Sequence, residues 1–533
     1  MFEENQFNSN LAPENILAVQ KVALTLTEFF AKRGYEAADI PTIVDMSMVE
    51  QANSRFSKNV LKLFDEAGQT LALRTELTQP LAKMVASYHT KLEFPQKYFY
   101  NANVFRFKGS QTDSAKELKQ VGVECFGQDA KTADKETINL LLDAVEKISL
   151  KNYRVSITDA RIWQKVFELY GDKNMSFSDE LDNLDTQASA LLKDDSLSLA
   201  AQVYKALKQR NLVKLEKLVA GKAELEIFAK SSDIKDFEKA FDLDLSNLTQ
   251  LTGLCETVVF EPLQCPDLRL YTGLHFMLNA QGSGAMLALG GRYDKLCAKF
   301  GADISAIGFA FYVKELNKVL DKKPSKKTLK IAAAKGGLFE KAQSFLEAKG
   351  LSFPEDRNRK LILELDAENK FGFEQIEVLL VRGHDVPVYV ENGGADLGIV
   401  GLDVVLDSKA SCYLLKDLEY GHCRLSVCAI KDRYKTVFDL PKQTRVATTF
   451  PNLAKEFFSL KGINAEVINL YGSVELGPLT DLSEVIVDLV ATGKTLKENN
   501  LEELESFLDC SAYLIANNSS YKLYKENLNK LLT

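Results

Sequence analysis

The residues with the clearest chemical use lie in Val485–Leu496, which reads VIVDLVATGKTL. The apolar run predicts a buried strand, after which a turn leads into a helix that begins at about Thr495. Unpaired backbone N–H groups and a positive dipole at such a helix start favour a phosphate. Thr492 adds a hydroxyl donor, and Gly493 lets the backbone come close to the anion. The segment therefore predicts a phosphate site, in which Asp488 can accept from ribose hydroxyls or hold a magnesium-bound water.

Two other interpretations of this segment have to be weighed. Gly493-Lys494-Thr495 resembles the end of a Walker nucleotide-binding loop, but that loop requires a glycine where Asp488 stands. The second alternative is a capped helix start that binds no ligand, and the segment alone leaves it open.

The composition is that of a globular protein with several domains. The 533 residues suggest three or four domains at roughly 150 residues each. Apolar residues make up 46% and the formal net charge is -8, so no global positive field favours nucleic acid. No run approaches the ~20 apolar residues of a membrane-spanning helix, and the polar start MFEENQFNSN does not resemble a signal peptide. The eight scattered cysteines and four scattered histidines predict reduced thiols, a cytoplasmic location and no metal held by the protein alone.

The chain divides at residues 321–328, where DKKPSKKT is short, charged and contains a proline. Before this linker, residues 1–320 alternate between helical and strand-like runs, with a helical insertion expected at about 172–250. After it, residues 329–533 show short buried runs that suit parallel strands covered on both faces. The strands from about 427 to 506 are expected to form a second lobe, from which the chain returns to the first.

The segment after the linker carries several blocks in a fixed order and spacing. They are Arg359-Lys-Leu, Arg382–Glu391, Gly394–Gly401, Leu470–Leu476, Asp488–Leu496 and Leu514–Asn517. Together they resemble the short-form ATP phosphoribosyltransferases. The resemblance implies an α/β fold of two lobes, like a periplasmic binding protein, with the active site between the lobes.

The resemblance also implies the reaction. N1 of the ATP adenine displaces pyrophosphate from C1 of phosphoribosyl pyrophosphate, and Mg2+ accompanies the substrates. Arg359 and Arg382 are implied to stabilise the leaving pyrophosphate, because a planar guanidinium grips phosphate oxygens in two places. The implied phosphoribosyl pyrophosphate site comprises Asp488, Ala491, Thr492, Gly493, Lys494, Thr495 and Glu475. The implied ATP site comprises Lys335, Gly336 and Gly398.

Two positions depart from the family pattern. The family usually has arginine where Gly337 stands, so one phosphate contact is missing. It usually has glycine where Asp481 stands, at an expected turn that aspartate tolerates. His384 is expected to be structural, because N1 of adenine has no proton to remove. The missing arginine supports the alternative of a non-catalytic nucleotide-binding or anion-binding protein.

Residues 1–320 resemble the class II histidyl-tRNA synthetases, and more closely the regulatory subunit that partners the short-form enzymes. The segments concerned are Leu73–Pro80, Val104–Arg106, Leu118–Glu124, Leu270–Gly273, Gly290–Asp294 and Ile307–Ala310. The resemblance implies an α+β domain with an antiparallel sheet and helices.

Several features argue against aminoacylation. Lys108-Gly109 replaces the acidic residue that contacts adenine in the synthetases. Glu315 places a negative charge where a triphosphate would lie, and Pro266 replaces an arginine expected at the substrate carboxylate. No anticodon-binding domain follows residue 320. A working histidyl-tRNA synthetase is therefore the less favoured alternative.

The amino-acid pocket matches the synthetases better. The matching residues are Glu76, Arg106, Gln120, Glu124 and Tyr271. Carboxylates can hold an α-amino group or a ring N–H, and an arginine can hold a carboxylate. The resemblance implies histidine as an allosteric inhibitor, the alternative being an inherited but empty pocket. Because the family's regulatory and catalytic subunits assemble, we expect a homo-oligomer such as a tetramer.

Overall fold

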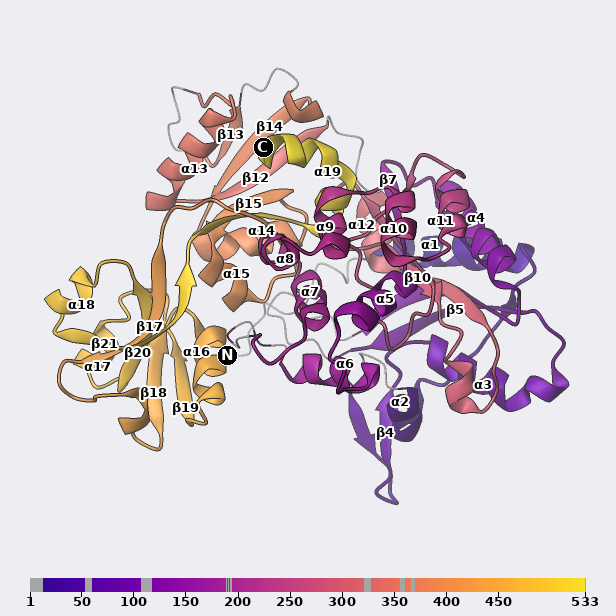
Figure 1. Ribbon diagram of the computed structural model, residues 1–533, viewed down its shortest axis with the longest axis horizontal. Helices are drawn as coiled ribbons and strands as arrows, with labels where there is room; N and C mark the ends of the chain where they lie inside the picture. The colour runs from indigo at the N-terminus through magenta and orange to yellow at the C-terminus, as the bar shows by residue number, and fades with distance from the viewer. Residues whose placement is uncertain are drawn as a thin grey trace.

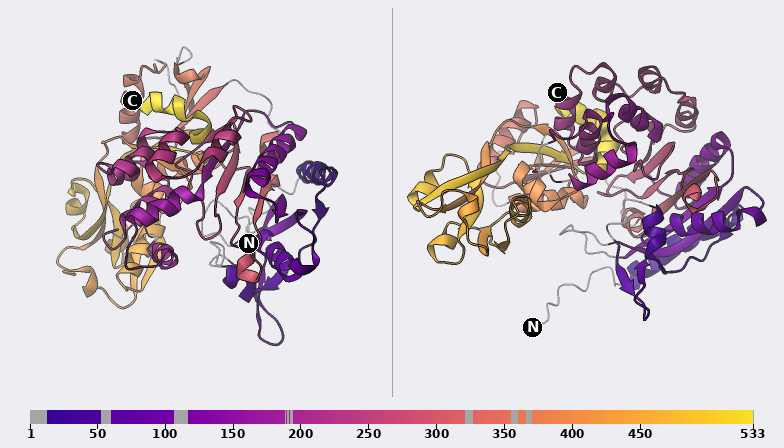
Figure 2. Two further views of the ribbon diagram at one scale, coloured as in Figure 1. Left: turned by 45° about the vertical axis from the view of Figure 1, so that its right-hand side comes forward. Right: turned by 60° about the horizontal axis from the view of Figure 1, so that its bottom comes forward.

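The computed structural model describes residues 13–52, 60–106, 117–187, 189, 191, 194–320, 327–354, 360–365 and 370–532. Figure 1 shows the N-terminal half beside a C-terminal half that divides into two lobes. The second of these lobes lies at the end of the molecule farthest from the first strands of the N-terminal half (Figure 2). Within the described ranges, no helix combines the length and apolar character needed to cross a membrane.

The N-terminal half is built on an eight-stranded sheet. In spatial order its strands are β1 (Glu36–Ala37), β5 (Gln96–Phe105), β6 (Glu117–Phe126), β11 (Ala306–Tyr312), β10 (Ala288–Arg292), β9 (Leu274–Ala280), β7 (Tyr153–Asp159) and β8 (Val258–Phe260). Only the two outer pairs, β1 with β5 and β7 with β8, are parallel. A smaller antiparallel sheet contains β2 (Ile43–Asp45), β4 (Thr70–Leu73) and β3 (Lys62–Phe64).

Helices cover both faces of the large sheet. One face packs against α1 (Pro13–Lys32), α4 (Ala130–Lys147) and α12 (Val313–Leu320). Leu26 and Phe30 of α1 are fully buried there against Val121 and Val123 of β6, and each such side chain contributes roughly 1.5–3 kcal/mol. The other face carries α3 (Thr78–Tyr88), η3 (His89–Lys91) and η4 (Cys297–Phe300), with α2 (Met46–Ala52) beside them.

Between β7 and β8 the chain forms a group of helices. They are α5 (Ala160–Tyr170), α6 (Phe177–Thr186), α7 (Leu199–Lys208), α8 (Leu212–Val219), α9 (Ala223–Lys230), α10 (Ile234–Phe241) and α11 (Ser246–Thr252). Ser176, Ser198 and Asn211 cap three of the helix starts by accepting backbone N–H groups. The rings of Trp163 and Phe228 stack at 4.8 Å in the core of this group.

The first lobe of the C-terminal half contains a six-stranded sheet. Its strands, in spatial order, are β13 (Ile362–Leu365), β14 (Gln375–Val381), β12 (Thr328–Ala334), β15 (Leu397–Gly401), β22 (Ala512–Ala516) and β16 (Tyr413–Asp417). The surrounding helices are α13 (Gly337–Ala348), α14 (Val386–Glu391), α15 (Leu402–Ser408), α19 (Asn518–Leu532), η5 (Lys370–Gly372) and η6 (Gly383–Asp385).

The second lobe contains a five-stranded sheet. Its order is β19 (Ala465–Asn469), β18 (Thr444–Thr448), β20 (Val485–Val490), β17 (Cys423–Ile430) and β21 (Leu501–Cys510), with α16 (Pro451–Leu460), α17 (Leu476–Leu479), α18 (Lys494–Glu498) and η7 (Val437–Asp439). Two crossings join the lobes, one between β16 and β17 and one at Ser511 between β21 and β22.

The two halves have the expected fold classes, α+β followed by a two-lobed α/β unit. The expectation of parallel strands was too broad, because β13, β16 and β22 in the first lobe and β17 and β21 in the second pair antiparallel. A buried apolar run fixes the depth of a strand and leaves its direction open. For β16, β17, β21 and β22 the strand direction follows from the two crossings, which return the chain alongside its outgoing path.

Candidate active site and amino-acid pocket

The first lobe places two cations at one edge of its sheet. β12 and β14 are parallel neighbours, with Ala334 opposite Val381. Lys335 and Arg382 directly follow these strands and are exposed, and the Lys335 N–H donates to the Val381 carbonyl at 2.9 Å. Gly336 follows with a φ of +97°, a conformation that glycine adopts without strain. The side chains of Lys335 and Arg382 therefore start from the same edge of the sheet, where they can bind an anion.

The second lobe places the predicted phosphate turn at the end of β20. Asp488 lies inside this strand, which continues to Val490, and the turn at 491–493 is exposed or half-buried. Gly493 has a φ of +71°, and the Lys494 N–H donates to the Thr492 hydroxyl at 3.4 Å. α18 begins at Lys494, one residue before the expected start, and has only 5 residues. Its dipole is correspondingly small, so the N–H groups and hydroxyls of the turn are the main donors available to an anion.

One ring contact across the lobe boundary brings the segment after β14 close to the segment after β18. His384, two residues after Arg382, lies with its ring 5.6 Å from that of Phe450, which follows the end of β18. β18 is the parallel neighbour of β20, with Thr448 opposite Val487. Arg382 and the turn after β20 thus belong to carboxyl ends that approach one another, which is where open α/β sheets bind ligands.

Asp488 is a carboxyl group of this region with a clearly altered pKa. Burial raises the pKa of Asp488 to about 6, the Leu489 N–H lowers it, and the nearby carboxylate of Glu475 raises it further. A cation or a pair of hydroxyl donors between the two carboxylates would relieve their repulsion. Among the described residues no group of three or more His, Cys, Asp or Glu side chains could hold a metal. Carboxylate oxygens of this kind accept from hydroxyl donors or lie near hard cations.

The remaining predicted residues of this half differ in their surroundings. Arg359 lies outside the described residues. Gly398 is buried in β15, where an added Cβ would lie 2.8 Å from Val386 and 2.9 Å from Val390. The packing of α14 on the sheet gives this glycine a structural reason, and its predicted contact with ATP stays a prediction. Gly337 starts α13 in open space, so nothing nearby replaces the absent arginine.

Asp407 joins the two lobes beside these edges. It lies in α15 of the first lobe, is 6% exposed, and accepts the N–H groups of Asn452 and Leu453 at 2.9 Å each. These groups open α16 of the second lobe, so the carboxylate caps a helix across the boundary. Burial raises the pKa of Asp407, and the two N–H groups oppose that rise.

Replacing Asp407 with alanine is expected to weaken the binding of the phosphate-bearing substrate that the sequence predicts for this lobe boundary. Loss of a cap is worth roughly 0.5–2 kcal/mol, so we expect the Michaelis constant to rise about 2- to 30-fold. Steady-state kinetics measures this, and Asp439→Ala is the control, because Asp439 caps η7 within one lobe. An equal effect of both substitutions would mean that the interlobe position of Asp407 has no special importance.

In the N-terminal half, the five predicted pocket residues converge. Glu76, Arg106, Gln120, Glu124 and Tyr271 all line one cavity. Gln120 and Glu124 lie four residues apart on β6 and so share a face of the sheet. Arg106 follows β5 and is held by its Nε, which donates to the Thr75 carbonyl at 2.9 Å. The cavity therefore combines carboxylates with an arginine, as an amino acid requires.

Glu124 is the most buried carboxylate of the cavity. It is 2% exposed and accepts from Thr78 Oγ1 at 2.7 Å, from Tyr100 Oη at 3.2 Å and from Tyr293 Oη. Burial raises the pKa of Glu124 to about 7, although the three hydroxyl donors lower it and Glu76 raises it. The sequence did not single out these three donors. Thr78 and Tyr293 lie in the Leu73–Pro80 and Gly290–Asp294 segments that carried the resemblance, whereas Tyr100 lies in none of them.

The fold and the two sites define a class of protein: a two-lobed α/β unit with a candidate phosphate cleft, joined to a synthetase-like unit with an amino-acid pocket. Residues 382–533 match the family model "ATP phosphoribosyltransferase", and residues 8–316 match the model "Histidyl-tRNA synthetase". An ATP phosphoribosyltransferase from a Synechococcus species is 42% identical over 222 residues, which is 40% of this chain and 94% of that protein. The enzyme of that name from Variovorax paradoxus is 43% identical over 206 residues, 38% of this chain and 94% of that protein.

A solved structure is also similar. The ATP phosphoribosyl transferase (HisG:HisZ) complex from Thermotoga maritima contains a chain that is 34% identical, with a TM-score of 0.34, covering 38% of this chain and 96% of that one. On the sequence matches, this chain belongs to the ATP phosphoribosyltransferase family and carries a histidyl-tRNA-synthetase-like part in front. Membership of this family favours an enzyme over a non-catalytic binding protein.

Proposed function

We propose that the cleft between the two C-terminal lobes joins ATP to phosphoribosyl pyrophosphate, forming phosphoribosyl-ATP and pyrophosphate in histidine biosynthesis in the cytoplasm. The observation that carries the proposal is the pairing of two edges: Lys335 and Arg382 on one, and the turn after Asp488 on the other. Transfer of a phosphorylated sugar with loss of pyrophosphate needs cations for the leaving group and donors for the sugar phosphate, so it needs both edges.

The reaction assigns a task to each edge. As pyrophosphate leaves, negative charge grows on it and the ribosyl carbon becomes cation-like. Arg382, and Arg359 by resemblance, would stabilise that leaving charge, while the turn from Ala491 to Thr495 would hold the sugar phosphate. Lys335 and Gly336 would contact ATP. Mg2+ bound with the substrates would share the charge, and Asp488 and Glu475 fit a role at the ribose hydroxyls or the metal-bound water.

The direct test is to mix the purified protein with ATP, Mg2+ and phosphoribosyl pyrophosphate and to follow the ultraviolet absorbance of the product. Formation of phosphoribosyl-ATP with stoichiometric pyrophosphate supports the proposal. Binding of both substrates without turnover would instead identify a binding protein.

Replacing Thr492 with valine is expected to raise the Michaelis constant for phosphoribosyl pyrophosphate by roughly tenfold or more, because a hydrogen bond to a charged phosphate is worth about 1.5–3 kcal/mol. Turnover at saturation should change less. Thr252→Val is the control, because it alters a half-buried threonine of the N-terminal half whose hydroxyl donates to the Thr249 carbonyl at 3.1 Å. Unchanged kinetics in Thr492→Val would contradict the assignment of this turn.

We also propose that histidine inhibits the enzyme by binding in the N-terminal pocket. The convergence of the five pocket residues on one cavity supports this role. Glu315 supports regulation over aminoacylation, since its negative charge stands where the resemblance places a triphosphate. It lies in α12 and forms an ion pair with Lys318 at 2.7 Å. The assay above, repeated with histidine, tests the inhibition.

A homo-oligomer, such as a tetramer, completes the proposal. Apolar side chains stand exposed on the small sheet, with Phe64 at 74% and Ile43 at 51% exposure, which is unusual for a surface that stays in water. Light scattering of the purified chain gives the mass, and a monomer at micromolar concentration would contradict this part of the proposal.

A further inference from the structure

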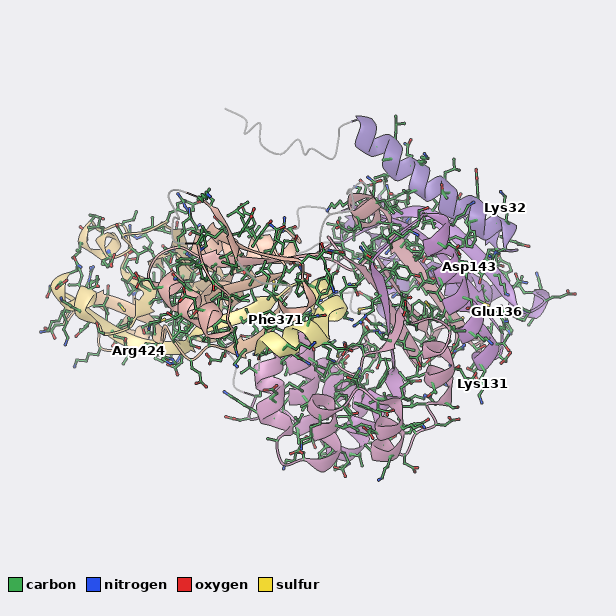
Figure 3. The ribbon with its side chains drawn as sticks, turned by 90° about the horizontal axis from the view of Figure 1, so that it is seen from above. Lys32, Lys131, Glu136, Asp143, Phe371 and Arg424 are labelled. Atoms are coloured by element: carbon green, nitrogen blue, oxygen red, sulfur yellow. The ribbon has the colours of Figure 1, made fainter. Side chains whose placement is uncertain are left out.

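The last helix of the chain, α19, contacts both halves of the protein. It follows β22 of the first lobe, and its Tyr521 ring stacks on Tyr413 of that lobe at 4.2 Å. Toward the N-terminal half, Lys525 Nζ lies 3.1 Å from Glu261 Oε1, and Arg154 Nη1 donates to the Lys522 carbonyl at 2.6 Å. Figure 3 shows α19 between the first lobe, where Phe371 is labelled, and the N-terminal half.

The amino-acid pocket and the α19 contacts lie along one face of the large sheet. The register places Glu124, Gly308, Gly291 and His275 opposite one another on β6, β11, β10 and β9. An added Cβ would meet Glu124 Oε2 at Gly308 and the Tyr271 ring at Gly291, so the two glycines leave the space between these walls. Next along β9 on the same face come Met277 and Asn279, which contact Lys522 and Ser519 of α19.

A continuous series of buried polar contacts links the pocket wall to α19. The rings of Tyr271 and His275 meet edge to face at 4.5 Å. His275 Nδ1 lies 2.8 Å from Gln264 Nε2, and Lys522 Nζ donates to Gln264 Oε1 at 2.7 Å. His275, Gln264 and Lys522 are each 1% exposed.

The chemistry of Lys522 fixes the direction of this series. Lys522 Nζ donates to the Gln264 oxygen, so the Gln264 NH2 is the group that faces His275. His275 Nδ1 therefore accepts this hydrogen bond, which places the ring hydrogen on Nε2. Because each group has one arrangement that satisfies its neighbours, a shift of the Tyr271–His275 pair leaves a buried polar group unsatisfied unless α19 also adjusts.

We propose that His275, Gln264 and Lys522 couple the amino-acid pocket to the catalytic half. The inference rests on the proposed binding of histidine in that pocket. When histidine binds and displaces the Tyr271 ring, the change is passed through α19 to the first lobe. In turn, the state of the catalytic lobes favours one arrangement of the pocket. Coupling of this kind requires only that the ligand prefer one of two arrangements.

Lys522→Met tests the proposal, because methionine fills the space beside Met277 without donating to Gln264. Binding of histidine, measured by calorimetry, should keep a dissociation constant within about 3-fold of the parent protein. Inhibition of turnover, typically a ~5- to 150-fold effect for coupled sites, should fall below about 3-fold. Lys525→Met is the matched control: it removes another α19 contact with the N-terminal half and should stay fully inhibited.

Gln264→Glu is the second variant and covers a failure of Lys522→Met to fold. It retains an acceptor for Lys522 and removes the N–H given to His275, so it should also bind histidine and escape inhibition. Full inhibition in whichever of these variants folds, or loss of histidine binding in it, would overturn the proposed coupling.

Measurements on the parent chain separate this inference from the proposed function. If the parent chain binds no histidine, the proposed regulation fails and the coupling fails with it. If the parent is inhibited and the variants are equally inhibited, only the coupling fails. As a further readout, saturating substrates should weaken histidine binding to the parent by the same factor as histidine weakens substrate binding, and the variants should lose this reciprocity.

Discussion

Replacing Arg382 with alanine is expected to reduce turnover by about 10²- to 10³-fold, the loss seen when one group that stabilises developing negative charge is removed. Arg382 directly follows β14, at the sheet edge it shares with Lys335. Arg382 is expected to supply a larger share of the charge stabilisation because Gly337 stands where the family usually has an arginine. Among the described residues, no side chain occupies the space beside Gly337. Rapid-quench and steady-state measurements with saturating substrates give the effect on the chemical step.

Two further variants make the Arg382 result specific. Arg382→Lys retains the charge and loses the planar fork, so we expect activity between that of the parent and that of Arg382→Ala. Arg433→Ala removes an exposed arginine of the second lobe, whose guanidinium lies 5.5 Å from the centre of the Tyr434 ring, and should be nearly neutral. Parent-like turnover in Arg382→Ala would show that leaving-group charge is stabilised elsewhere.

The sequence was sufficient to select the five residues that line the cavity, since each lies in a segment that carries the resemblance to the synthetases. Gln120 and Glu124 share a face because they are four residues apart on one strand, which alternation alone implies. The donors that surround Glu124 could not be read in this way. Tyr100 and Tyr293 reach Glu124 through the pairing of β5, β6, β11 and β10, and Thr78 reaches it through the packing of α3 on that sheet.

The link between the halves was also hidden from sequence reasoning. Lysine is almost never fully buried unless it is paired, so a helix such as α19 would be assigned an exposed lysine face. Lys522 is buried because its partner, Gln264, lies 258 positions away in the chain. Burial lowers the pKa of Lys522 to about 7, with Glu261 opposing that shift. Local patterns describe which segments are helices, whereas this contact depends on how two separately folded units dock.

Glycines illustrate another difficulty, because a motif glycine can serve packing as well as ligand contact. Gly398 belongs to a family block whose implied role is a contact with ATP, which stays a prediction, and the structure shows it packed closely against Val386 and Val390. Gly493 also belongs to a block, and its positive φ is a feature that the turn before α18 requires. Only coordinates distinguish a glycine needed for packing from one needed for a turn.

The second large effect is expected at Glu124, where replacement by alanine should weaken histidine binding by about 10- to 100-fold and relieve inhibition while leaving turnover without histidine unchanged. A buried charged hydrogen bond to the ligand ammonium is worth roughly 1.5–3 kcal/mol, which sets this range. Calorimetry measures the affinity, and the product assay measures the inhibition. Glu136→Ala is the control, since it removes a carboxylate on α4 that pairs with Lys97 outside the pocket. Persistent inhibition would place the sensor elsewhere.

The pH dependence gives a sharper form of the same prediction. Burial raises the pKa of Glu124 from 4.5 to about 7, so in the empty pocket the Glu124 carboxyl is largely neutral at pH 6 and largely ionised at pH 8. An ammonium ligand needs the ionised form of Glu124, so histidine affinity should rise from pH 6 to pH 8, and Glu124→Gln should flatten the rise.

Folding stability has the opposite sign. A group whose pKa is raised on folding contributes most below pH 4.5, and that contribution is lost as the pH passes 7. The stability of Glu124→Gln relative to the parent should therefore increase from pH 5 to pH 8 in thermal unfolding, by at most about 3 kcal/mol. A carboxylate that is ionised throughout would give parallel curves and would remove the physical basis of the predicted pH response.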